Sequence, residues 1–460
     1  MQLRIDNHHL RESLEQFVRT VSEAGGKALL VGGCVRDALT GSAIKDIDVE
    51  VYGLAPGRLR EVTESQFPVD LVGEAFGVLK FKALPIEVSL PRRETRKGQG
   101  QRGFMITADP DMDPREAAAR RDFTCNALAY DLLTDELLDF FGGVADLQGH
   151  VLRHVSGHFD EDPLRVLRGM QLAARLDATL APETVERCRM LRMDEIAPER
   201  VFEEWHKLIL LGLRPSKGLA VLETTGWLAF FPELAALVGC QQDPQWHPEG
   251  DVFVHTGHVL DFFAAERAGD PWEDLVVGFA CLCHDLGKPL TTEFSDGQWR
   301  SHSHDEAGFA PTVTFLERLR APKALVDEVV PLVAEHLAPA LLHQGGAGSN
   351  AVRRLANRVG RLDRLVRVAR ADHGGRPPKR WDGFPAGQWL LETAAQLNVA
   401  DSRPVALVMG RHLIDHLHLE PSPRFGQVLS ACFEAQLDGR ITTLQEGMEL
   451  ARKLVAEMAV

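Results

Sequence analysis

Two aspartates, Asp46 and Asp48, stand on either side of Ile47 in the stretch GGCVRDALTGSAIKDIDVEVYG, residues 32–53. Side chains alternate between the two faces of a β-strand, so both carboxylates are expected on one face while Ile47 and Val49 point into a core. Neighbouring like charges are costly unless they share a cation, and hard oxygen ligands suit Mg²⁺. The spacing therefore predicts a magnesium site on a strand.

A third carboxylate is available from Glu87 in PIEVSL, a segment with the same strand alternation. Three carboxylates on neighbouring strands can hold two metal ions, which suits phosphoryl or nucleotidyl transfer.

The residues before the aspartates suit a phosphate group. Gly32 and Gly33 end one predicted strand and open a short helix that carries Arg36. Glycines let backbone N–H groups approach phosphate, a helix N-terminus favours anions, and an arginine adds a bidentate donor. The segment thus predicts a triphosphate beside its metal ions. Taken alone, an Asp-x-Asp is more often a solvated strand face, and a Gly-Gly is usually a turn.

A second set of metal-ligating side chains occurs in the order H…HD…D, at His255, His284-Asp285 and Asp372, with further histidines at His304 and His336. Imidazole and carboxylate ligands from separate helices can converge in an all-α core and hold one or two divalent cations, either Mg²⁺ or a transition metal. Water activated there would attack a phosphate ester. A single buried histidine is usually a satisfied core residue, so the prediction rests on the whole series.

Residues 351–380 contain ten Lys and Arg against two Asp, in a chain whose net charge is −15. Apolar residues recur there at helical spacing, at Val352, Leu355, Val359, Leu362, Val366 and Ala369. An arginine ridge is expected largely opposite this stripe, formed by Arg354, Arg358, Arg361 and Arg364. Such a ridge would bind RNA phosphates by charge. The alternative is a solvated helix face whose arginines pair with surrounding acidic groups.

Hydrophobic periodicity shows which elements would position these groups. Residues 1–25 predict a helix, followed by five short segments rich in Val and Ile, at residues 28–33, 46–53, 68–73, 77–84 and 85–91. Only one short helix, VRDALTG, is expected among them, so the chain is not a doubly wound βαβ array. Strand signals stop near residue 150. We therefore predict an α+β fold, with a mixed β-sheet in a small head and then a long all-α body.

Composition narrows the class of protein. A chain of 460 residues is too long for one core, so two to four domains are expected. The net charge of −15 argues against indiscriminate binding to nucleic acid or membrane but allows a local basic site. The seven cysteines form no CxxC pair, which predicts buried free thiols in a reducing compartment. Without a signal-peptide pattern or a long apolar run, a cytoplasmic soluble protein with no membrane partner is expected.

Four motifs of the first 176 residues resemble a known family. They are LLVGGCVRDALTG…KDIDVEVYG, RRDFTCNALAYD, FFGGVADLQGHVLRHV and EDPLRVLRGMQLAARL. Their order resembles that of class II template-independent nucleotidyltransferases, the tRNA CCA-adding enzymes and bacterial poly(A) polymerases. The resemblance implies that Gly33 and Arg36 contact the triphosphate and that Asp46 and Asp48 hold the metals. It also implies that the ribose and phosphates are bound by Arg121, Asp122 and Asn126.

The same resemblance implies that Asp162 and Arg165, the Asp and Arg of an EDxxR motif, hydrogen-bond the incoming base, with Arg168 on the same helix face. Cytosine and adenine both offer an amino donor beside a ring-nitrogen acceptor, which suits a carboxylate and a guanidinium. Guanine and uracil present the reverse pattern. The EDxxR motif therefore predicts selection of CTP and ATP.

The residues of this motif also allow a purely structural interpretation. Pro163 suits the first position of a helix with Asp162 as its N-cap, and Glu161 and Arg165 have the spacing of an i,i+4 pair. The chain departs from the family at Gln171-Leu172, where Arg-Phe is usual. That difference bears on whether one protein adds all three nucleotides.

Two further segments are similar to parts of CCA-adding enzymes. Residues 89–109 are basic and Gly-rich, which predicts either a mobile loop over the active site or a solvated linker. The H…HD…D series, followed by Gly287-Lys288, resembles the HD phosphohydrolase superfamily. In CCA-adding enzymes with this extension, it implies 2′,3′-cyclic phosphodiesterase, 2′-nucleotidase or phosphatase activity on RNA ends.

The predicted organisation has a nucleotidyltransferase head at 1–150, a helical neck at 151–235, an HD domain at 236–385 and a helical tail at 386–460. The expected function is CCA addition to tRNA from CTP and ATP. The alternatives are an enzyme that adds only CC or only A, a poly(A) polymerase, and an HD phosphohydrolase whose head only binds RNA. The oligomeric state is left open.

Overall fold

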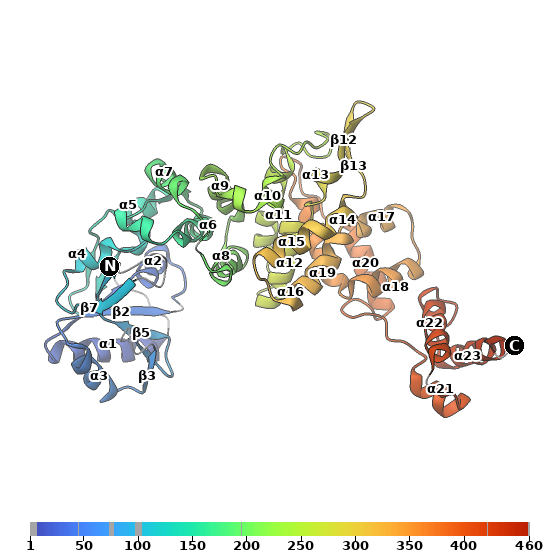
Figure 1. Ribbon diagram of the computed structural model, residues 1–460, viewed down its shortest axis with the longest axis horizontal. Helices are drawn as coiled ribbons and strands as arrows, with labels where there is room; N and C mark the ends of the chain where they lie inside the picture. Colours follow the sequence, from blue (N-terminus) through green and yellow to red (C-terminus); the bar gives the residue numbers. More distant parts are fainter. Residues whose placement is uncertain are drawn as a thin grey trace. The chain divides into compact units, whose positions relative to one another are not determined.

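The computed structural model describes residues 7–44, 46–72, 78–96, 104–194, 196–420 and 422–458 (Figure 1). The chain forms two compact units. The first runs through Glu204 and includes Ala220–Trp227, and the second comprises Trp205–Leu219 and the chain from Leu228 onward. The predicted division into four segments is finer than these two units.

The first unit is built on a seven-stranded mixed sheet, as predicted. Its strand order is β3 (Val69–Val72), β4 (Val78–Phe81), β5 (Ile86–Ser89), β2 (Ile47–Tyr52), β1 (Lys27–Val31), β8 (Ala129–Asp131) and β9 (Glu136–Leu138). Neighbours are antiparallel except β2 and β5, which are parallel. The five predicted segments all form strands of this sheet. β8 and β9 were not predicted.

Helices pack on this sheet and extend beyond it. The described helices up to residue 224 are α1 (His8–Glu23), α2 (Gly33–Thr40), α3 (Pro56–Glu64), α4 (Pro114–Ala119), α5 (Gly143–Gln148), α6 (Leu164–Leu176), α7 (Pro182–Met190), α8 (Pro198–Leu211) and α9 (Pro215–Thr224). α1 buries the predicted stripe, including Leu14, Phe17 and Val21. The ring of Phe17 meets those of Phe67 and Phe81 at 6.1 and 5.5 Å between centroids. The three rings belong to the core of the head.

Three expectations about secondary structure were wrong. α3 is a second helix among the strands, with Pro56 in its first turn and Leu59 buried beneath it. Residues 89–109 are not all loop, because β6 (Arg92–Arg96) and β7 (Phe104–Ala108) pair as a hairpin, while residues 97–103 lie outside the described residues.

Strands also continue past residue 150. The short strands β10 (Val151–Leu152) and β11 (Thr179–Leu180) pair in parallel, and β12 (Thr292–Ser295) and β13 (Gln298–Ser301) form a hairpin. Asp296 and Gly297 both have positive φ at its turn. Asp-Gly favours that geometry, so a usable signal was present in the sequence.

The second unit is mainly helical. Its helices through residue 396 are α10 (Pro232–Ala235), α11 (Val252–Ala265), α12 (Pro271–Cys283), α13 (Lys288–Thr291), α14 (His304–Ala307), α15 (Phe309–Arg318), α16 (Lys323–Ala334), α17 (Ala338–Gln344), α18 (Ser349–Val359), α19 (Leu362–Gly374) and α20 (Pro385–Gln396). α12 is buried from Asp274 to Cys283 and packs against α11, α16 and α19. A helix that is apolar all round needs such a central position. α12 therefore ends inside the body, immediately before His284.

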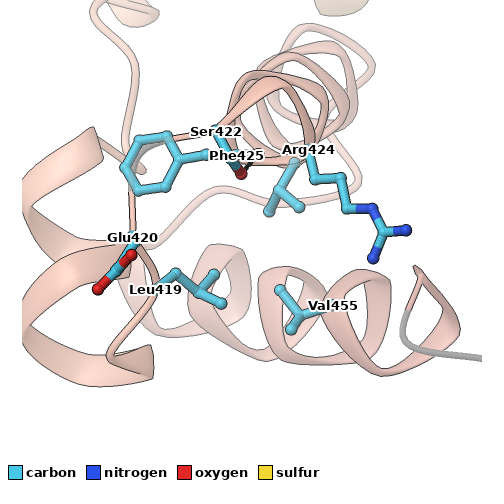
Figure 2. A pocket seen from close by; sticks show the side chains of 7 residues that line it. Leu419, Glu420, Ser422, Arg424, Phe425 and Val455 are labelled. Carbon is cyan, nitrogen blue, oxygen red and sulfur yellow. Dashed lines mark hydrogen bonds between the residues drawn. The ribbon is translucent and has the colours of Figure 1, made fainter.

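The C-terminal tail has a small core of its own. It consists of α21 (Gly410–Leu417), α22 (Pro423–Leu437) and α23 (Leu444–Met458). Leu413, Val428, Cys432 and Ala451 are buried there. A cavity of about 220 Å³ remains beside Phe425 (Figure 2). Its lining is largely apolar and suggests no chemistry.

Two general expectations can be compared with the structure. All seven cysteines are free, and all but Cys240 are buried, as predicted. Among the described helices, none combines the length and the apolar character that a bilayer-crossing segment needs.

Candidate active sites in the head and the helical body

The acidic face of β2 has the predicted alternation. Asp46, just before the strand, and Asp48 are exposed, whereas Ile47 and Val49 are completely buried. In the parallel pairing of β2 with β5, Asp48 lies directly opposite Glu87. Register partners of adjacent strands project on the same face of a sheet. The sheet therefore brings the second aspartate and the predicted third carboxylate side by side.

Negative charge is concentrated on this face. Although its side chain reaches solvent, neighbouring protein atoms partly desolvate the Asp48 carboxylate, and this raises its pKa above the ordinary value. Arg121 opposes that rise, and the carboxylates of Glu87, Asp46 and Glu50 add to it. A divalent cation would relieve this repulsion, so the donor set fits Mg²⁺. Glu50 was not predicted, although it continues the alternation of residues 46 and 48.

The carboxylates of the head lie farther apart than the metal-ligating side chains of the helical body. One of them, Glu87, is paired with a lysine, since Lys80 Nζ lies 2.7 Å from Glu87 Oε1. Among the described residues, the groups of three metal-ligating atoms within 4.8 Å of one another lie in the helical body and not in the head.

The turn between β1 and α2 lies against the guanidinium of Arg121, next to the acidic face of β2. Gly32 has φ +76°, and a Cβ at this position would lie 2.6 Å from Arg121 Nη1. Only glycine accommodates both this backbone conformation and the close guanidinium. Arg121 Nη2 in turn lies 3.9 Å from Glu50 Oε1. The predicted phosphate-binding glycine and Arg121 are therefore neighbours, next to the carboxylates.

A continuous chain of polar side chains connects α2 with α6, and it is buried except for the half-exposed arginines at its two ends. Arg36 donates to Asp37 and to Asn126, whose side-chain amide donates to Asp122 Oδ1 at 3.0 Å. Two arginines of α6 close the chain at its ends: Arg168 Nε donates to Asp122 Oδ2 at 2.6 Å, and Arg175 Nη2 to Asp37 Oδ2 at 2.7 Å. We name these six residues the α2–α6 chain.

The α2–α6 chain changes how three predicted ligands are understood. Burial opposes ionisation of Asp122, but the charge of Arg168 and the hydrogen bond from Asn126 lower its pKa below the ordinary value. The side chains of Arg36, Asp122 and Asn126 bond to one another or to their neighbours in this structure. In this structure they hold the head together around the turn that was predicted to bind phosphate.

The EDxxR motif, which was predicted to select the base, lies at the start of α6. Asp162 Oδ1 accepts from the N–H of Leu164 at 3.1 Å, and its Oδ2 accepts from Arg200 at 2.8 Å. Asp162 was expected as the N-cap and Pro163 as the first helical residue, but Pro163 is the N-cap and α6 begins at Leu164. Asp162 nevertheless accepts from a backbone N–H of the first turn.

Arg165 does not make the expected pair with Glu161. It donates instead to the carbonyls of His158 and Arg120, both at 2.7 Å. The nearer partner of Glu161 is the ring of His158, at 2.8 Å. Two carbonyl bonds to different nitrogens fix the plane of the Arg165 guanidinium.

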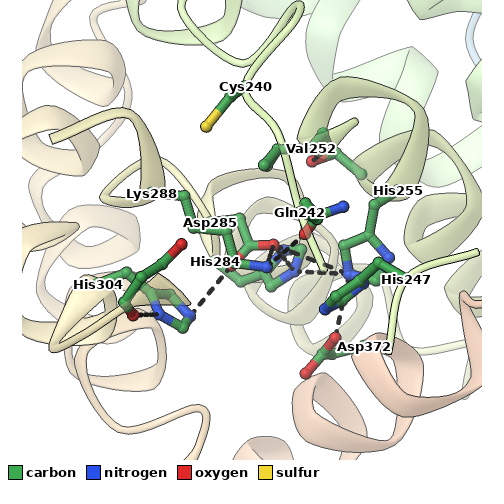
Figure 3. Close-up of polar contacts among 12 residues, drawn as sticks. Cys240, Gln242, His247, Val252, His255, His284, Asp285, Lys288, His304 and Asp372 are labelled. Atoms are coloured by element: carbon green, nitrogen blue, oxygen red, sulfur yellow. Dashed lines mark hydrogen bonds and ion pairs between the residues drawn. The ribbon is translucent and has the colours of Figure 1, made fainter. Parts of the chain in front are cut away.

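The second predicted site is assembled from several helices. His255 comes from α11, His284 and Asp285 follow α12, Asp372 comes from α19, His304 opens α14, and His336 follows α16. Figure 3 shows His255, His284 and His304 around Asp285, with Asp372 joined to His255 by a dashed line. His255 Nε2 lies 3.1 Å from Asp372 Oδ1 and 3.4 Å from His284 Nε2. We call these six residues the HD cluster.

The imidazoles of the HD cluster are oriented for metal binding. His284, His304 and His336 each direct Nδ1 to the carbonyl of the residue three positions earlier, at 2.8, 2.8 and 2.7 Å. An N–H donated at Nδ1 leaves Nε2 as the acceptor, which is how hydrogen bonds behind the ligands prepare histidines for a metal. All three Nε2 atoms then lie within 4.0 Å of an oxygen of Asp285.

Asp285 joins two groups of ligands. One group is Asp285 with His255 and His284, and the other is Asp285 with His304 and His336. Both Asp285 oxygens are buried and have no hydrogen bond of regular geometry within the described residues, although Lys288 Nζ lies 2.8 Å from Oδ2. His336 Nε2 is also buried and has no hydrogen bond within the described residues. Buried groups with unused bonding capacity fit one or two divalent cations bridged by this carboxylate.

Sequence reasoning missed two residues beside this cluster. Glu249 Oε1 lies 2.7 Å from His255 Nδ1 and 2.8 Å from His247 Nδ1. Burial alone would raise its pKa, but the hydrogen bonds from the two imidazoles lower the pKa of Glu249 to about 2. Both residues lie in QQDPQWHPEGD, which carries break signals and no periodicity. Only the proximity of His and Glu could have drawn attention to them.

The predicted arginine ridge is not a single exposed surface. The six apolar residues of the stripe are buried as expected, but Gly360, with φ +86°, separates α18 from α19. Arg364 is itself buried, contrary to the prediction.

Each arginine of this ridge is paired with carboxylates. Arg354 bonds to Asp438 and Glu434, Arg358 to Glu335, Arg361 to Glu273 and Asp363, and Arg364 to Glu273 and Glu328. Apart from Asp363, these partners come from segments outside the two helices, which a single helix pattern does not show. The alternative of pairing with acidic groups therefore describes this surface better, and RNA binding by the four arginines stays a prediction.

We expect Arg364→Ala to destabilise the second unit by about 2 kcal/mol, because Glu273 and Glu328 would lose a shared cation that is largely removed from water. Urea unfolding measures this change. Arg411→Ala, an exposed position on α21, is the control and should leave the unfolding midpoint unchanged. A loss of tRNA affinity at an unchanged midpoint would contradict the structural role.

Comparison with known proteins places these sites in context. Residues 28–153 match the family described as "Poly A polymerase head domain", and residues 178–237 match "Probable RNA and SrmB- binding site of polymerase A". The chain is 36% identical over 392 residues to a multifunctional CCA protein of Xylella fastidiosa, covering 82% of this chain and 91% of that protein. It is 37% identical over 420 residues to a multifunctional CCA protein of Stenotrophomonas maltophilia, covering 88% and 97%.

A solved structure shares the fold over nearly the whole length. The CCA-adding enzyme of Bacillus stearothermophilus, determined in complex with CTP, superposes with a TM-score of 0.67 and 23% identity, covering 98% of this chain and 99% of that chain. This likeness concerns the fold. It agrees with the predicted class, a mixed-sheet head followed by a helical body.

Proposed function

We propose that the head of this chain, which belongs to the multifunctional CCA protein family, adds CCA to tRNA 3′ ends from CTP and ATP. The main support for this site is the register of β2 and β5, in which Asp48 lies opposite Glu87 on the exposed face of the sheet. Gly32 and Arg121 lie next to each other beside these carboxylates.

In this reaction the tRNA 3′-hydroxyl oxygen forms a bond to the α-phosphorus of the nucleotide. The bond from that phosphorus to pyrophosphate breaks, and the hydroxyl proton is lost to solvent. Asp46, Asp48 and Glu87 would hold Mg²⁺, which supplies charge neutralisation at the reacting phosphate. The backbone at Gly32-Gly33 and the guanidinium of Arg121 would bind the triphosphate on the other side of these carboxylates.

Nucleotide selection would fall to Asp162 and Arg165. A guanidinium has five N–H groups, so the two carbonyl bonds of Arg165 orient it and still leave donors for a ring nitrogen. The Asp162 carboxylate, held by Arg200, would accept from the exocyclic amino group of cytosine or adenine. Arg168, on the same helix, donates to Asp122 and so connects that helix to the segment that contains Asp122 and Asn126.

We further propose that the HD cluster hydrolyses phosphate esters at RNA ends, with 2′,3′-cyclic phosphates, 2′-phosphates and phosphomonoesters as the candidate substrates. Water oxygen forms the new bond to phosphorus, one ester P–O bond breaks, and the departing alkoxide takes up a proton. A divalent metal, either Mg²⁺ or a transition metal, would polarise the phosphate. His255, His284, Asp285 and Asp372 would hold it, with His304 and His336 as ligands of a second ion.

The test of the head offers purified protein three tRNA substrates, ending at N73, C74 or C75, with CTP and ATP supplied separately. Full CCA addition predicts CTP incorporation on the first two and a single AMP on the third. Failure to incorporate AMP would indicate an enzyme that adds only CC, and failure with CTP one that adds only A. Repeated AMP addition would indicate a poly(A) polymerase. No incorporation would leave the head as an RNA-binding module, contrary to the proposal.

The cytoplasmic location remains a prediction, supported by the free and mostly buried cysteines.

A further inference from the structure

A cavity of about 210 Å³ opens in the helical body at a segment whose sequence signalled only a chain break. The side chains that line it include Trp246, His373, Arg376, Lys379, Arg380 and Trp381. All belong to the second unit and to the described residues.

This cavity borders the HD cluster through two connections. Arg376 lines the cavity, and its Nη2 donates to Oδ1 of Asp372 at 2.7 Å. Trp246 is followed directly by His247, which shares Glu249 with His255. Figure 3 shows His247 beside His255 and Asp372. A ligand in the cavity would therefore lie next to the metal-binding carboxylate.

Aromatic rings and cations alternate around the cavity. Trp246 is 59% exposed, and Lys379 Nζ lies 5.2 Å from its ring centroid. Arg370 covers the ring of Trp381 at 5.2 Å, and Phe262 packs against that ring at 4.9 Å between centroids. Exposed aromatic surface beside cations is typical of sites for single-stranded nucleic acid, because every base has a face that can stack.

The charge of the cavity favours an anion. Within the described residues, Lys379 and Arg380 have no carboxylate partner at ion-pair distance, unlike the four arginines of the predicted ridge. Three cations and one carboxylate, Asp382, line the cavity in a protein of net charge −15. A purely apolar ligand would leave Lys379 and Arg380 without an anionic partner, since Arg376 is already paired with Asp372.

We propose that the cavity binds the nucleoside phosphate whose ester the HD cluster hydrolyses, with the base stacked on Trp246 and the phosphate facing Arg376 and Lys379. This inference rests on the proposed hydrolytic function of the cluster. It makes the substrate a base-bearing nucleotide, supplied by an RNA 3′ end or as a free nucleotide, and not any small phosphate ester.

The test compares the full-length metal-loaded protein with Trp246→Ala. The substrates are an RNA oligonucleotide ending in a 2′,3′-cyclic phosphate, the same oligonucleotide without its terminal base, and free 2′,3′-cyclic AMP. Because one stacked base contributes appreciably to affinity, Trp246→Ala should raise KM for the base-bearing oligonucleotide about tenfold with little change in kcat. KM for the abasic oligonucleotide should not change. Trp246→Phe, which keeps a ring, should restore most of the affinity.

Trp272→Ala is the matched control, because Trp272 is an exposed tryptophan on α12 that does not line the cavity. It should leave all three KM values unchanged. A rise for free 2′,3′-cyclic AMP as well as for RNA identifies the nucleotide itself as the ligand, and a rise for RNA alone identifies the RNA end. Equal KM values for base-bearing and abasic RNA in every variant would overturn the proposal while leaving hydrolysis intact.

Absence of hydrolysis by the unmodified protein would instead remove the proposed function of the HD cluster. The cavity is then tested by equilibrium dialysis of adenosine 2′-phosphate, with CTP present to occupy the head. Binding that is lost in Trp246→Ala and kept in Trp272→Ala supports the site. Binding that is the same in both variants refutes it.

Discussion

Asp48→Asn should reduce the incorporation of CMP and AMP into tRNA on the order of a thousandfold or more, because it removes one charge from the pair of carboxylates proposed to hold the metal. The substitution keeps the shape of the side chain and should preserve the fold. Relief of repulsion among Asp48, Asp46, Glu50 and Glu87 should even favour the folded head. The measurement is single-turnover extension of a tRNA that ends at C75, with saturating ATP and Mg²⁺.

Asp70→Asn provides the matched control. Asp70 is an exposed carboxylate of β3 in the same sheet and pairs with Lys82, away from the β2–β5 register. Its substitution should leave extension within about twofold of the unmodified protein. The assignment of the metal site would be refuted if Asp48→Asn retained more than a tenth of the original rate. It would also be refuted if both variants lost activity equally.

His284→Ala should abolish the hydrolysis of 2′,3′-cyclic phosphates, again by about a thousandfold, while nucleotide addition continues at nearly its original rate. His284 is fully buried, with Nε2 3.1 Å from Asp285 Oδ2, so its removal deletes a ligand and leaves a polar cavity. Asp48→Asn should show the converse pattern and keep the hydrolytic activity. Loss of both activities in either variant would contradict two independent sites.

A metal-binding measurement distinguishes loss of the metal site in His284→Ala from misfolding of that variant. Mn²⁺ added to metal-free protein should raise the thermal midpoint of the unmodified chain, since a ligand that binds only the folded state stabilises it. Measured in the Asp48→Asn background, which removes the proposed metal site of the head, the shift should disappear when His284→Ala is added and persist when His258→Ala is added instead. His258 lies on α11, three residues after His255, and is not a member of the HD cluster. An unchanged shift in His284→Ala would show that the metal binds elsewhere.

The head was largely predictable because its chemistry depends on local alternation. The sequence DIDVEV specifies a strand with acids on one face, and the period of two places Asp46, Asp48 and the overlooked Glu50 together. The pairing of β2 with β5 joins segments about forty residues apart, so strand alternation could suggest Glu87 as the partner of Asp48 but could not fix their register. The α2–α6 chain was beyond prediction, since Asp37 and Arg175 are 138 residues apart.

The body was predictable in composition but not in geometry. The order H…HD…D selected side chains that the structure brings together from several helices, yet the position of Asp285 between two candidate groups of metal ligands depends on how those helices pack. For the four arginines of the predicted ridge, the helical pattern was visible in the sequence but the ion-pair partners were not. A helical pattern places Arg354 and Arg364 opposite an apolar stripe, but it cannot show that Asp438, 84 residues away, and Glu273, 91 residues away, meet them.

The α2–α6 chain has a consequence for how this protein can evolve. Six side chains on α2, η2 (Thr124–Asn126), the turn before η2 and α6 bond to one another. Because four of them are buried, replacing one member leaves a buried neighbour without its partner. Substitutions at Arg36, Asp122 and Arg175 should therefore be strongly epistatic, tolerated in compensated sets and rejected singly. The helix proposed to select the base and the turn proposed to bind the phosphates would then change together in evolution.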